Sequence, residues 1–210
     1  VAYNIEGHTY HQADFESKFN AFEGNLGVQT RKTLACGRSD CKPATFSVYM
    51  PENYWRYNTA ADSDNNGFGW TMPCGSEATK FPVLELLGNI AHNSANNGIN
   101  TGCQYKPTST VYFYNNTLSR NGGGGAFHKV AGDIHYVHSR FAENSLSDIR
   151  WQGFAAGAVS TRFNAQIRDS YFLGGKGEVG IYGPKGEYFF VSGAVFEDYG
   201  SKSPAITGCA

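Results

Sequence analysis

Apolar and polar residues alternate in short segments along the second half of the chain. Gly177–Tyr182 and Tyr188–Phe196 show this alternation on either side of a Gly-Pro-Lys-Gly turn. Alternation with a period of two predicts strands that bury one face. Pro184 and Gly186 suit the backbone angles of a tight turn. The pattern therefore predicts a β-hairpin near the C-terminus.

More short strands are predicted between residue 105 and this hairpin, at intervals typical of a barrel or a sandwich. They are Val111–Tyr114, Gly132–Val137 and Val159–Ile167. A closed barrel is the favoured arrangement, because closure leaves no exposed sheet edge. No internal repeat of fixed period is apparent.

The first half has a different pattern, in which two segments show the period of amphipathic helices. Ala13–Phe22 carries three phenylalanines at helical spacing, and Thr79–Asn93 has Pro82 in its expected first turn. Strands are predicted at Phe46–Met50 and Tyr54–Tyr57 between them. One face of the second helix would carry Leu84, Leu87, Gly88, Ala91 and His92.

The change of pattern near residue 104 predicts two domains, at 1–104 and 105–210. The expected fold is mainly β, with an α+β N-terminal subdomain that has short helices. The C-terminal part would be a β-barrel.

Composition favours an extracellular protein rich in strands and turns. Aromatic residues are 15%, charged residues only 17%, and 26 of the 210 residues are glycine. A net charge of -1 gives no reason to expect a nucleic acid or an acidic membrane as partner. No apolar stretch reaches about 20 residues, so no membrane insertion is expected.

The five cysteines bear on the compartment. Cys36 and Cys41 would close a short loop and Cys74 and Cys103 a longer one, which leaves Cys209 over. Disulfides in an oxidising compartment are favoured over zinc, because no Cys-x-x-Cys pair is present. Pairing among the last three cysteines stays open. We therefore expect a secreted protein whose signal peptide has been removed.

Two histidines have neighbours that suit a ligand site. His92 ends the predicted apolar face beside Gly88, which suits either a haem face or a contact with the helix C-terminus. His128 and Phe127 follow the run Gly122–Gly125, which predicts either a flexible loop over a ligand or an exposed hairpin tip. His8 is a reserve candidate.

Catalysis has little support in the sequence. It contains no Gly-x-Ser-x-Gly elbow, no His-Glu-x-x-His motif and no phosphate-binding loop. We therefore expect no enzyme activity. Clustered aromatic residues in the first half suit a planar ligand, a partner surface or a core: Tyr49, Tyr54, Trp55, Tyr57, Phe68 and Trp70.

The predicted hairpin, together with the segment Phe163–Phe172, resembles the barrel of Gram-negative surface proteins of the transferrin-binding-protein-B type. Among these, the size is most similar to the hemophilins, which are small secreted haem-binding proteins. This resemblance implies an N-terminal haem-holding domain and a C-terminal eight-stranded antiparallel β-barrel.

The same resemblance implies a function. The chain would be a hemophore that binds haem b through iron ligation by histidine and delivers it to an outer-membrane receptor, with host haemoglobin as a further partner. The alternative is a module that binds a host protein such as haemoglobin or transferrin. The implied iron ligands are His92, His128 and His8, and the implied haem contacts are Leu84, Leu87, Gly88, Ala91 and Phe127.

Overall fold

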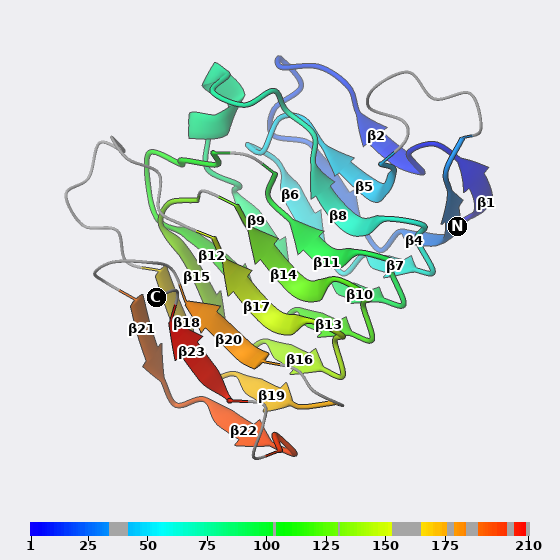
Figure 1. The fold of residues 1–210 in the computed structure, drawn as a ribbon. Coiled ribbons are helices and arrows are strands. Elements are labelled where there is room, and N and C mark those ends of the chain that lie inside the picture. The colour runs from blue at the N-terminus through cyan, green and yellow to red at the C-terminus, as the bar shows by residue number, and fades with distance from the viewer. Residues whose placement is uncertain are drawn as a thin grey trace.

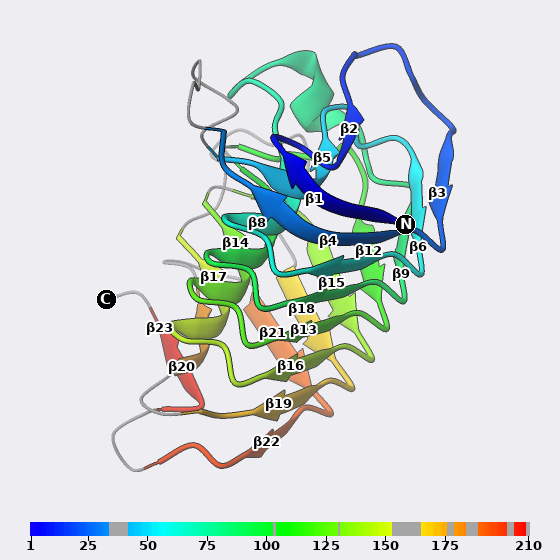
Figure 2. The same cartoon turned by 90° about the vertical axis from the view of Figure 1, so that its right-hand side faces the viewer.

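The chain forms a parallel β-solenoid in the computed structural model (Figures 1 and 2). The structure describes residues 1–33, 42–102, 104–129, 131–152, 165–175, 179–183, 189–200 and 204–208. Within these residues, each of the first seven coils contributes one strand to each of three sheets, which we call A, B and C in the order in which the chain enters them, and the last coil contributes a strand to A and to B. Strands of one sheet pair in parallel with their equivalents in the neighbouring coils.

Successive strands in the chain thus belong to different sheets. Sheet A holds β1 (Ala2–Glu6), β4 (Leu26–Arg31), β7 (Thr59–Ala61), β10 (Ile90–His92), β13 (Thr117–Ser119), β16 (Arg140–Ala142), β19 (Tyr171–Leu173) and β22 (Val195–Glu197). Sheet B holds β2 (Tyr10–Gln12), β5 (Ala44–Val48), β8 (Asn66–Trp70), β11 (Asn97–Asn100), β14 (Gly124–His128), β17 (Ser147–Trp151), β20 (Val179–Gly183) and β23 (Ile206–Gly208). Sheet C holds β3 (Ala21–Glu23), β6 (Tyr54–Arg56), β9 (Glu85–Leu87), β12 (Val111–Tyr114), β15 (Ile134–Val137), β18 (Ala165–Arg168) and β21 (Phe189–Ser192).

The expected eight-stranded antiparallel barrel is wrong. Strand β20 pairs with β17 and β23 in sheet B, whereas β21 pairs with β18 in sheet C, so the two strands of the predicted hairpin do not pair. The turn at 184–188 lies outside the described residues. Alternation correctly marks a strand with one buried face, but it does not identify the partner, which here lies one coil away.

The expected α+β N-terminal subdomain is also wrong. The segment Thr79–Asn93 contains the last two residues of the short 3-10 helix η1 (Glu77–Lys80), followed by β9 and β10, and Ala13–Phe22 runs into β3. The helical spacing is misleading here, because only Ala91 of that predicted face is buried, and the two strands turn Leu86 and Ala91 to the interior. Sheet B also continues past residue 104, since Asn97 pairs with Gly124 and Ile99 with Ala126.

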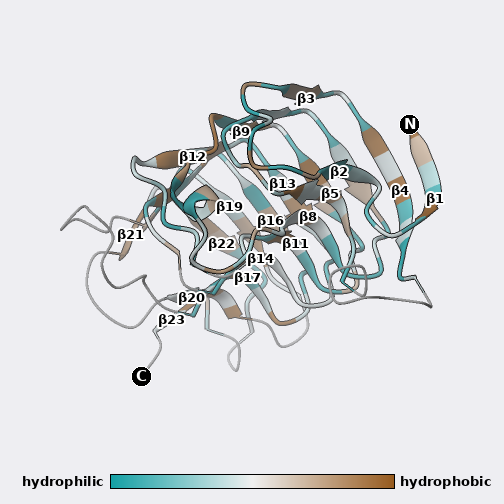
Figure 3. Cartoon of the chain, turned by 90° about the horizontal axis from the view of Figure 1, so that it is seen from above, coloured by the Kyte–Doolittle hydropathy of each residue, from teal (hydrophilic) through white to brown (hydrophobic). Residues whose placement is uncertain are grey.

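Aromatic side chains stack along the solenoid axis in the interior. The Phe46 ring lies 4.8 Å from that of Tyr10 and 4.7 Å from that of Phe68, nearly parallel to both. Phe141 and Phe172 stack at 4.8 Å further along. The first stack lies in sheet B and the second in sheet A. These spacings match the distance between paired strands, so neighbouring coils supply one ring each to these stacks. Strand β4 carries the hydrophobic Leu26 and Val28 in its first half and the hydrophilic Gln29 and Arg31 in its second (Figure 3).

Asparagine side chains form a ladder at the corner between sheets C and A. The Oδ1 atom of Asn58 accepts the backbone N–H of Asn25, and that of Asn89 accepts the backbone N–H of Asn58, each at 3.0 Å. Asn116 accepts from Asn89 in the same way at 3.0 Å, and Ser139 continues the series with its Oγ. Each such contact satisfies a buried backbone donor at a corner, where the sheets supply no partner.

The corner itself has the same length in every described coil. It consists of two residues, and the first has a positive φ, as at Tyr57 (53°), Gly88 (64°) and His138 (52°). By contrast, neighbouring ladder residues are separated by 33, 31, 27 and then 23 residues. The decrease from 31 to 23 follows the shortening of the corner between sheets B and C, and the coil that gives 33 has a longer corner between sheets A and B. The repeat therefore has no fixed period.

Several glycines are required because the coils approach each other closely. A Cβ atom at Gly98 would lie 2.7 Å from the carbonyl oxygen of Gly125 and 2.9 Å from Nδ2 of Asn121. A Cβ atom at Gly125 would lie 2.5 Å from the carbonyl oxygen of Asp148. The run Gly122–Gly125 therefore includes part of a buried strand, and the expected flexible loop is wrong here.

We predict that Asn89→Ala destabilises the fold by about 2–4 kcal/mol, because it leaves the backbone N–H of Asn58 and the carbonyl of Trp55 buried without a partner. Urea unfolding followed by tryptophan fluorescence measures the change. Asn93→Gly is the control, since Asn93 is exposed with a φ of 54° in the same coil. Equal losses in the two variants would contradict a structural role for the ladder.

A second prediction concerns the C-terminal end of the interior. The Tyr199 hydroxyl donates to the carboxylate of Asp148, which is fully buried and also accepts from Asn144 at 2.7 Å. Tyr199→Phe should lower the free energy of unfolding by about 1–3 kcal/mol, because the buried Asp148 carboxylate loses a hydrogen-bond donor. Tyr3→Phe, at a side chain that is 63% exposed, should change the unfolding free energy by less than about 0.5 kcal/mol.

Candidate functional site

The structure places the three predicted iron ligands in different surroundings. His92 lies in β10 of sheet A, where its backbone pairs with Ala61 and Ser119. His8 stacks on His11 with ring centroids 4.9 Å apart. His128 lies in β14 of sheet B, inside the core.

His128 is a core residue with both ring nitrogens in hydrogen bonds. Nδ1 lies 3.0 Å from the Thr101 hydroxyl and Nε2 lies 3.1 Å from the Tyr136 hydroxyl. The ring packs on Trp151 with centroids 4.5 Å apart. Burial lowers the pKa of His128 to about 3, so the imidazole is neutral at physiological pH.

The residues expected around a macrocycle do not form one face. Leu87 ends β9 in sheet C, Gly88 is a corner residue, and Ala91 is buried in β10 of sheet A. Leu84 precedes β9, and Phe127 lies in β14. The apolar helical face on which these contacts depended is absent from the described chain.

The resemblance to hemophilins and to transferrin-binding-protein-B-type proteins is therefore wrong, since the fold is a parallel solenoid. Across the residues that the structure describes, no three His, Cys, Asp or Glu side chains gather in a group able to hold a metal ion. The hemophore, haem-binding and metal-binding interpretations accordingly have no support. Cys74 is disulfide-bonded, and the other four cysteines lie outside the described residues, as do the pairings expected for them.

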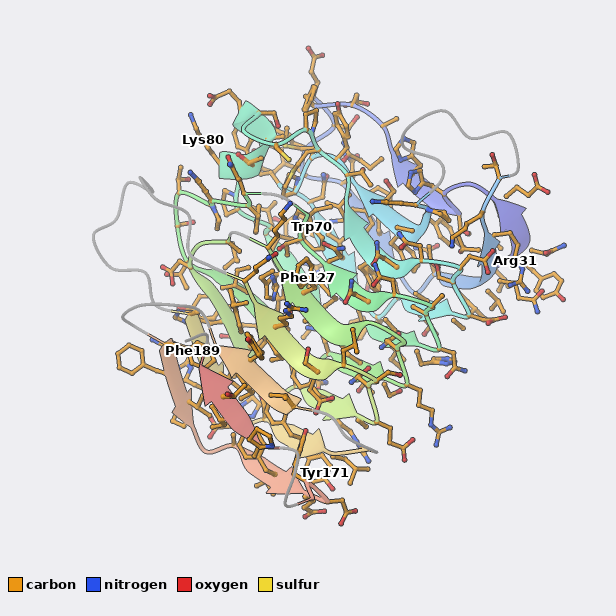
Figure 4. The ribbon with its side chains drawn as sticks, in the orientation of Figure 1. Arg31, Trp70, Lys80, Phe127, Tyr171 and Phe189 are labelled. Carbon is orange, nitrogen blue, oxygen red and sulfur yellow. The ribbon has the colours of Figure 1, made fainter. Side chains whose placement is uncertain are left out.

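A groove crosses several coils on the outer face of sheet B. It holds a cavity of about 340 Å³, and a neighbouring hollow of about 220 Å³ shares Lys42, Asn66 and Asn100 with it. We call the two together the outer groove. Figure 4 shows Phe127 near the middle of this face, with Trp70 beyond it. The side-chain amides that line the groove are those of Asn65, Asn66, Asn96, Asn97 and Asn100.

The amides in the groove are fixed from coil to coil. Asn66 Oδ1 accepts the backbone N–H of Asn97 at 3.2 Å and its Nδ2 at 3.4 Å. Asn96 Nδ2 donates to Asn65 Oδ1 at 3.2 Å. These contacts leave Asn97 Oδ1 and Asn66 Nδ2 without a hydrogen bond to another described residue. Both donor and acceptor groups are therefore offered to a ligand in the groove.

An aromatic and cationic row continues the groove along sheet B. Asn100 is in register with Phe127, Phe127 with Arg150, and Arg150 with Tyr182. The Arg150 guanidinium lies 5.9 Å from the ring centroid of Phe127 and 5.4 Å from that of Tyr182. The two rings hold the guanidinium in place from both sides.

The groove carries a positive charge. Lys42 and Arg150 line it, and neither forms an ion pair with a carboxylate among the described residues. No Asp or Glu is among its described lining residues. One serine–histidine contact lies on this sheet, Ser47 Oγ to His11 Nδ1 at 2.9 Å, but Ser47 is fully buried and inaccessible to a substrate. The arrangement suits binding of a polar ligand.

Sequence reasoning missed the groove amides. A Ser-x-Asn-Asn-Gly motif occurs at Ser63–Gly67 and again at Ser94–Gly98. The pattern predicts a turn at the first copy, and the helix predicted over Thr79–Asn93 ends just before the second copy. Recognition that the motif recurs would have placed these amides in equivalent positions of neighbouring coils.

Comparison with known proteins gives one similarity. The chain is 26% identical over 119 residues to mouse Fibrocystin-L, a match that covers 52% of this chain and 3% of that protein. This chain therefore corresponds to a small part of a much longer relative. No protein-family model matches the sequence.

The described residues contain no helix long and apolar enough to span a membrane.

We predict that His128 makes stability depend on pH. An ordinary histidine titrates near 6.5, and the folded protein holds His128 neutral down to a pKa of about 3. The unfolded state therefore binds more protons between these values, and stability falls as pH decreases below 6.5, by about 1.4 kcal/mol per unit. Lowering the pH from 6.5 to 5 should cost the wild type about 2 kcal/mol more than His128→Asn. Equal slopes in denaturant unfolding would contradict this assignment.

Proposed function

We propose that this chain is a non-catalytic module that binds an extended carbohydrate chain along the outer groove. The observation that carries the proposal is the series of fixed side-chain amides that continues into the row of Phe127, Arg150 and Tyr182 across successive coils. No general acid or base lines this surface in the described residues.

The chemistry of the lining matches a carbohydrate. Asn97 Oδ1 offers an acceptor and Asn66 Nδ2 a donor, which suits neighbouring hydroxyl groups on a sugar ring. The face of Phe127 offers an apolar platform for the C–H groups of the ring. Because the asparagine pair recurs in neighbouring coils, an extended ligand would meet amides in one part of the groove and the row of Phe127, Arg150 and Tyr182 in the next.

The charge of the groove favours an acidic carbohydrate. Lys42 and Arg150 have no described carboxylate to neutralise them, so a carboxylate or sulfate on the ligand would supply the missing partner. The Arg150 guanidinium is held between two rings, so it loses little conformational entropy when it binds a carboxylate or sulfate of the ligand.

The compartment we propose is extracellular or otherwise oxidising. Cys74 is disulfide-bonded, and disulfides persist mainly in such environments. Extracellular carbohydrates are then accessible to the groove. Haem binding and capture of a host protein stay predictions from the sequence alone, since no feature of the described structure favours either.

Binding is tested with defined oligosaccharides, in neutral and acidic forms, by calorimetric titration. We expect the acidic forms to bind more tightly and to weaken as the salt concentration rises. Phe127→Ala should weaken binding of both forms about tenfold, whereas Arg150→Gln should weaken only the acidic form by about that factor.

Tyr57→Ala is the matched control, because Tyr57 is an aromatic residue that is 55% exposed at the corner between sheets C and A. It should leave affinity unchanged. Failure of every neutral and acidic oligosaccharide to bind, or equal affinity of wild type, Phe127→Ala and Arg150→Gln, would overturn the proposed function.

A further inference from the structure

The sequence contains one Asn-x-Ser/Thr motif, Asn115-Asn116-Thr117. This motif is the acceptor for N-linked glycosylation in secretory compartments, where the modified asparagine must be accessible and followed by a hydroxyl-bearing residue two positions later. The structure shows whether this asparagine meets the requirement in the folded chain.

Asn115 and its neighbour Asn116 have opposite environments. Asn116 is fully buried in the ladder, where its Nδ2 donates to the Leu86 carbonyl at 3.0 Å. Asn115 is the exposed first residue of the corner, with a φ of 52°. Its backbone N–H donates to Val137, and its side-chain amide forms no hydrogen bond with another described residue. A substituent on Asn115 Nδ2 would therefore disturb no interaction of the ladder.

Equivalent corner positions show that this site accommodates an outward group. Tyr57 occupies it in one coil with a side chain that is 55% exposed, and His138 occupies it in another. The corner joins sheets C and A, whereas the outer groove lies on sheet B. A glycan at Asn115 would thus project from the edge of the solenoid opposite sheet B and leave the outer groove open.

We propose that Asn115 is an N-glycosylation site. The donor would be an oligosaccharide linked to a polyprenyl diphosphate. The bond between C1 of its first sugar and the phosphate oxygen breaks, the bond between Asn115 Nδ2 and C1 forms, and one amide proton is released. Thr117 is the hydroxyl-bearing residue of the motif. The proposal requires passage through an oxidising secretory compartment, with which the Cys74 disulfide agrees, and does not depend on the function of the groove.

The test is expression of the full chain with a secretion signal in cultured mammalian cells. Wild type should carry a glycan that peptide N-glycosidase removes, with Asn115 converted to Asp in the released peptide by mass spectrometry. Asn115→Gln and Thr117→Ala should abolish the modification, and Thr117→Ser should retain it. If Asn115→Gln is not secreted, the comparison of glycan attachment in Thr117→Ser and Thr117→Ala tests the site instead.

Translation in the presence of microsomes gives a second measurement that does not require export. A glycosidase-sensitive shift in wild type and Thr117→Ser, absent in Thr117→Ala, would support the site. An unmodified wild type, secreted or imported beside a control glycoprotein that is modified in the same preparation, would overturn the proposal.

Discussion

Hydrogen bonding between coils, along the solenoid axis, is the constraint on which the rest of this structure depends. Within the sheets, backbone groups satisfy each other, but at every corner the chain turns and its donors lose their strand partners. Between sheets C and A the asparagine ladder supplies the missing acceptors. A side chain of fixed length has to reach the same backbone position in the next coil, which explains why this corner has two residues in each described coil.

The three corners differ in how much their length varies and in what their residues contact. The corner between C and A is fixed in length, and its exposed first residue varies most, from Tyr57 to Asn115 to His138. The corner between B and C varies in length and accounts for the changing spacing of the ladder. The corner between A and B places Asn65 and Asn96 beside the outer groove, where they contact each other.

Individual strands could be predicted from the sequence, but their partners could not. Val111–Tyr114 is a strand as expected from its alternation, because one face of that strand is buried. Paired residues lie 23 to 33 positions apart, so the residues near a strand do not indicate its partner. Because this spacing is unequal, the sequence shows no repeat of one fixed period. Adjacent strands in the sequence were therefore paired as a hairpin, and a strand–corner–strand segment ending in His92 was interpreted as a helix.

The site was harder to predict than the fold, because single residues gave the wrong chemistry. The sequence suggested His128 as a ligand to iron. In the structure its two ring nitrogens are hydrogen-bonded to Thr101 and Tyr136, so the residue is part of the packed core. The groove is lined by common residue types, mainly asparagine, and these form a continuous surface only because the coils align them. Asn100, Phe127 and Arg150 are far apart in the chain and lie in one row because β11, β14 and β17 pair in register. Parallel register therefore places repeated asparagines in an ordered row on the outer face, and a change in the length of one coil is tolerated as long as that register is kept.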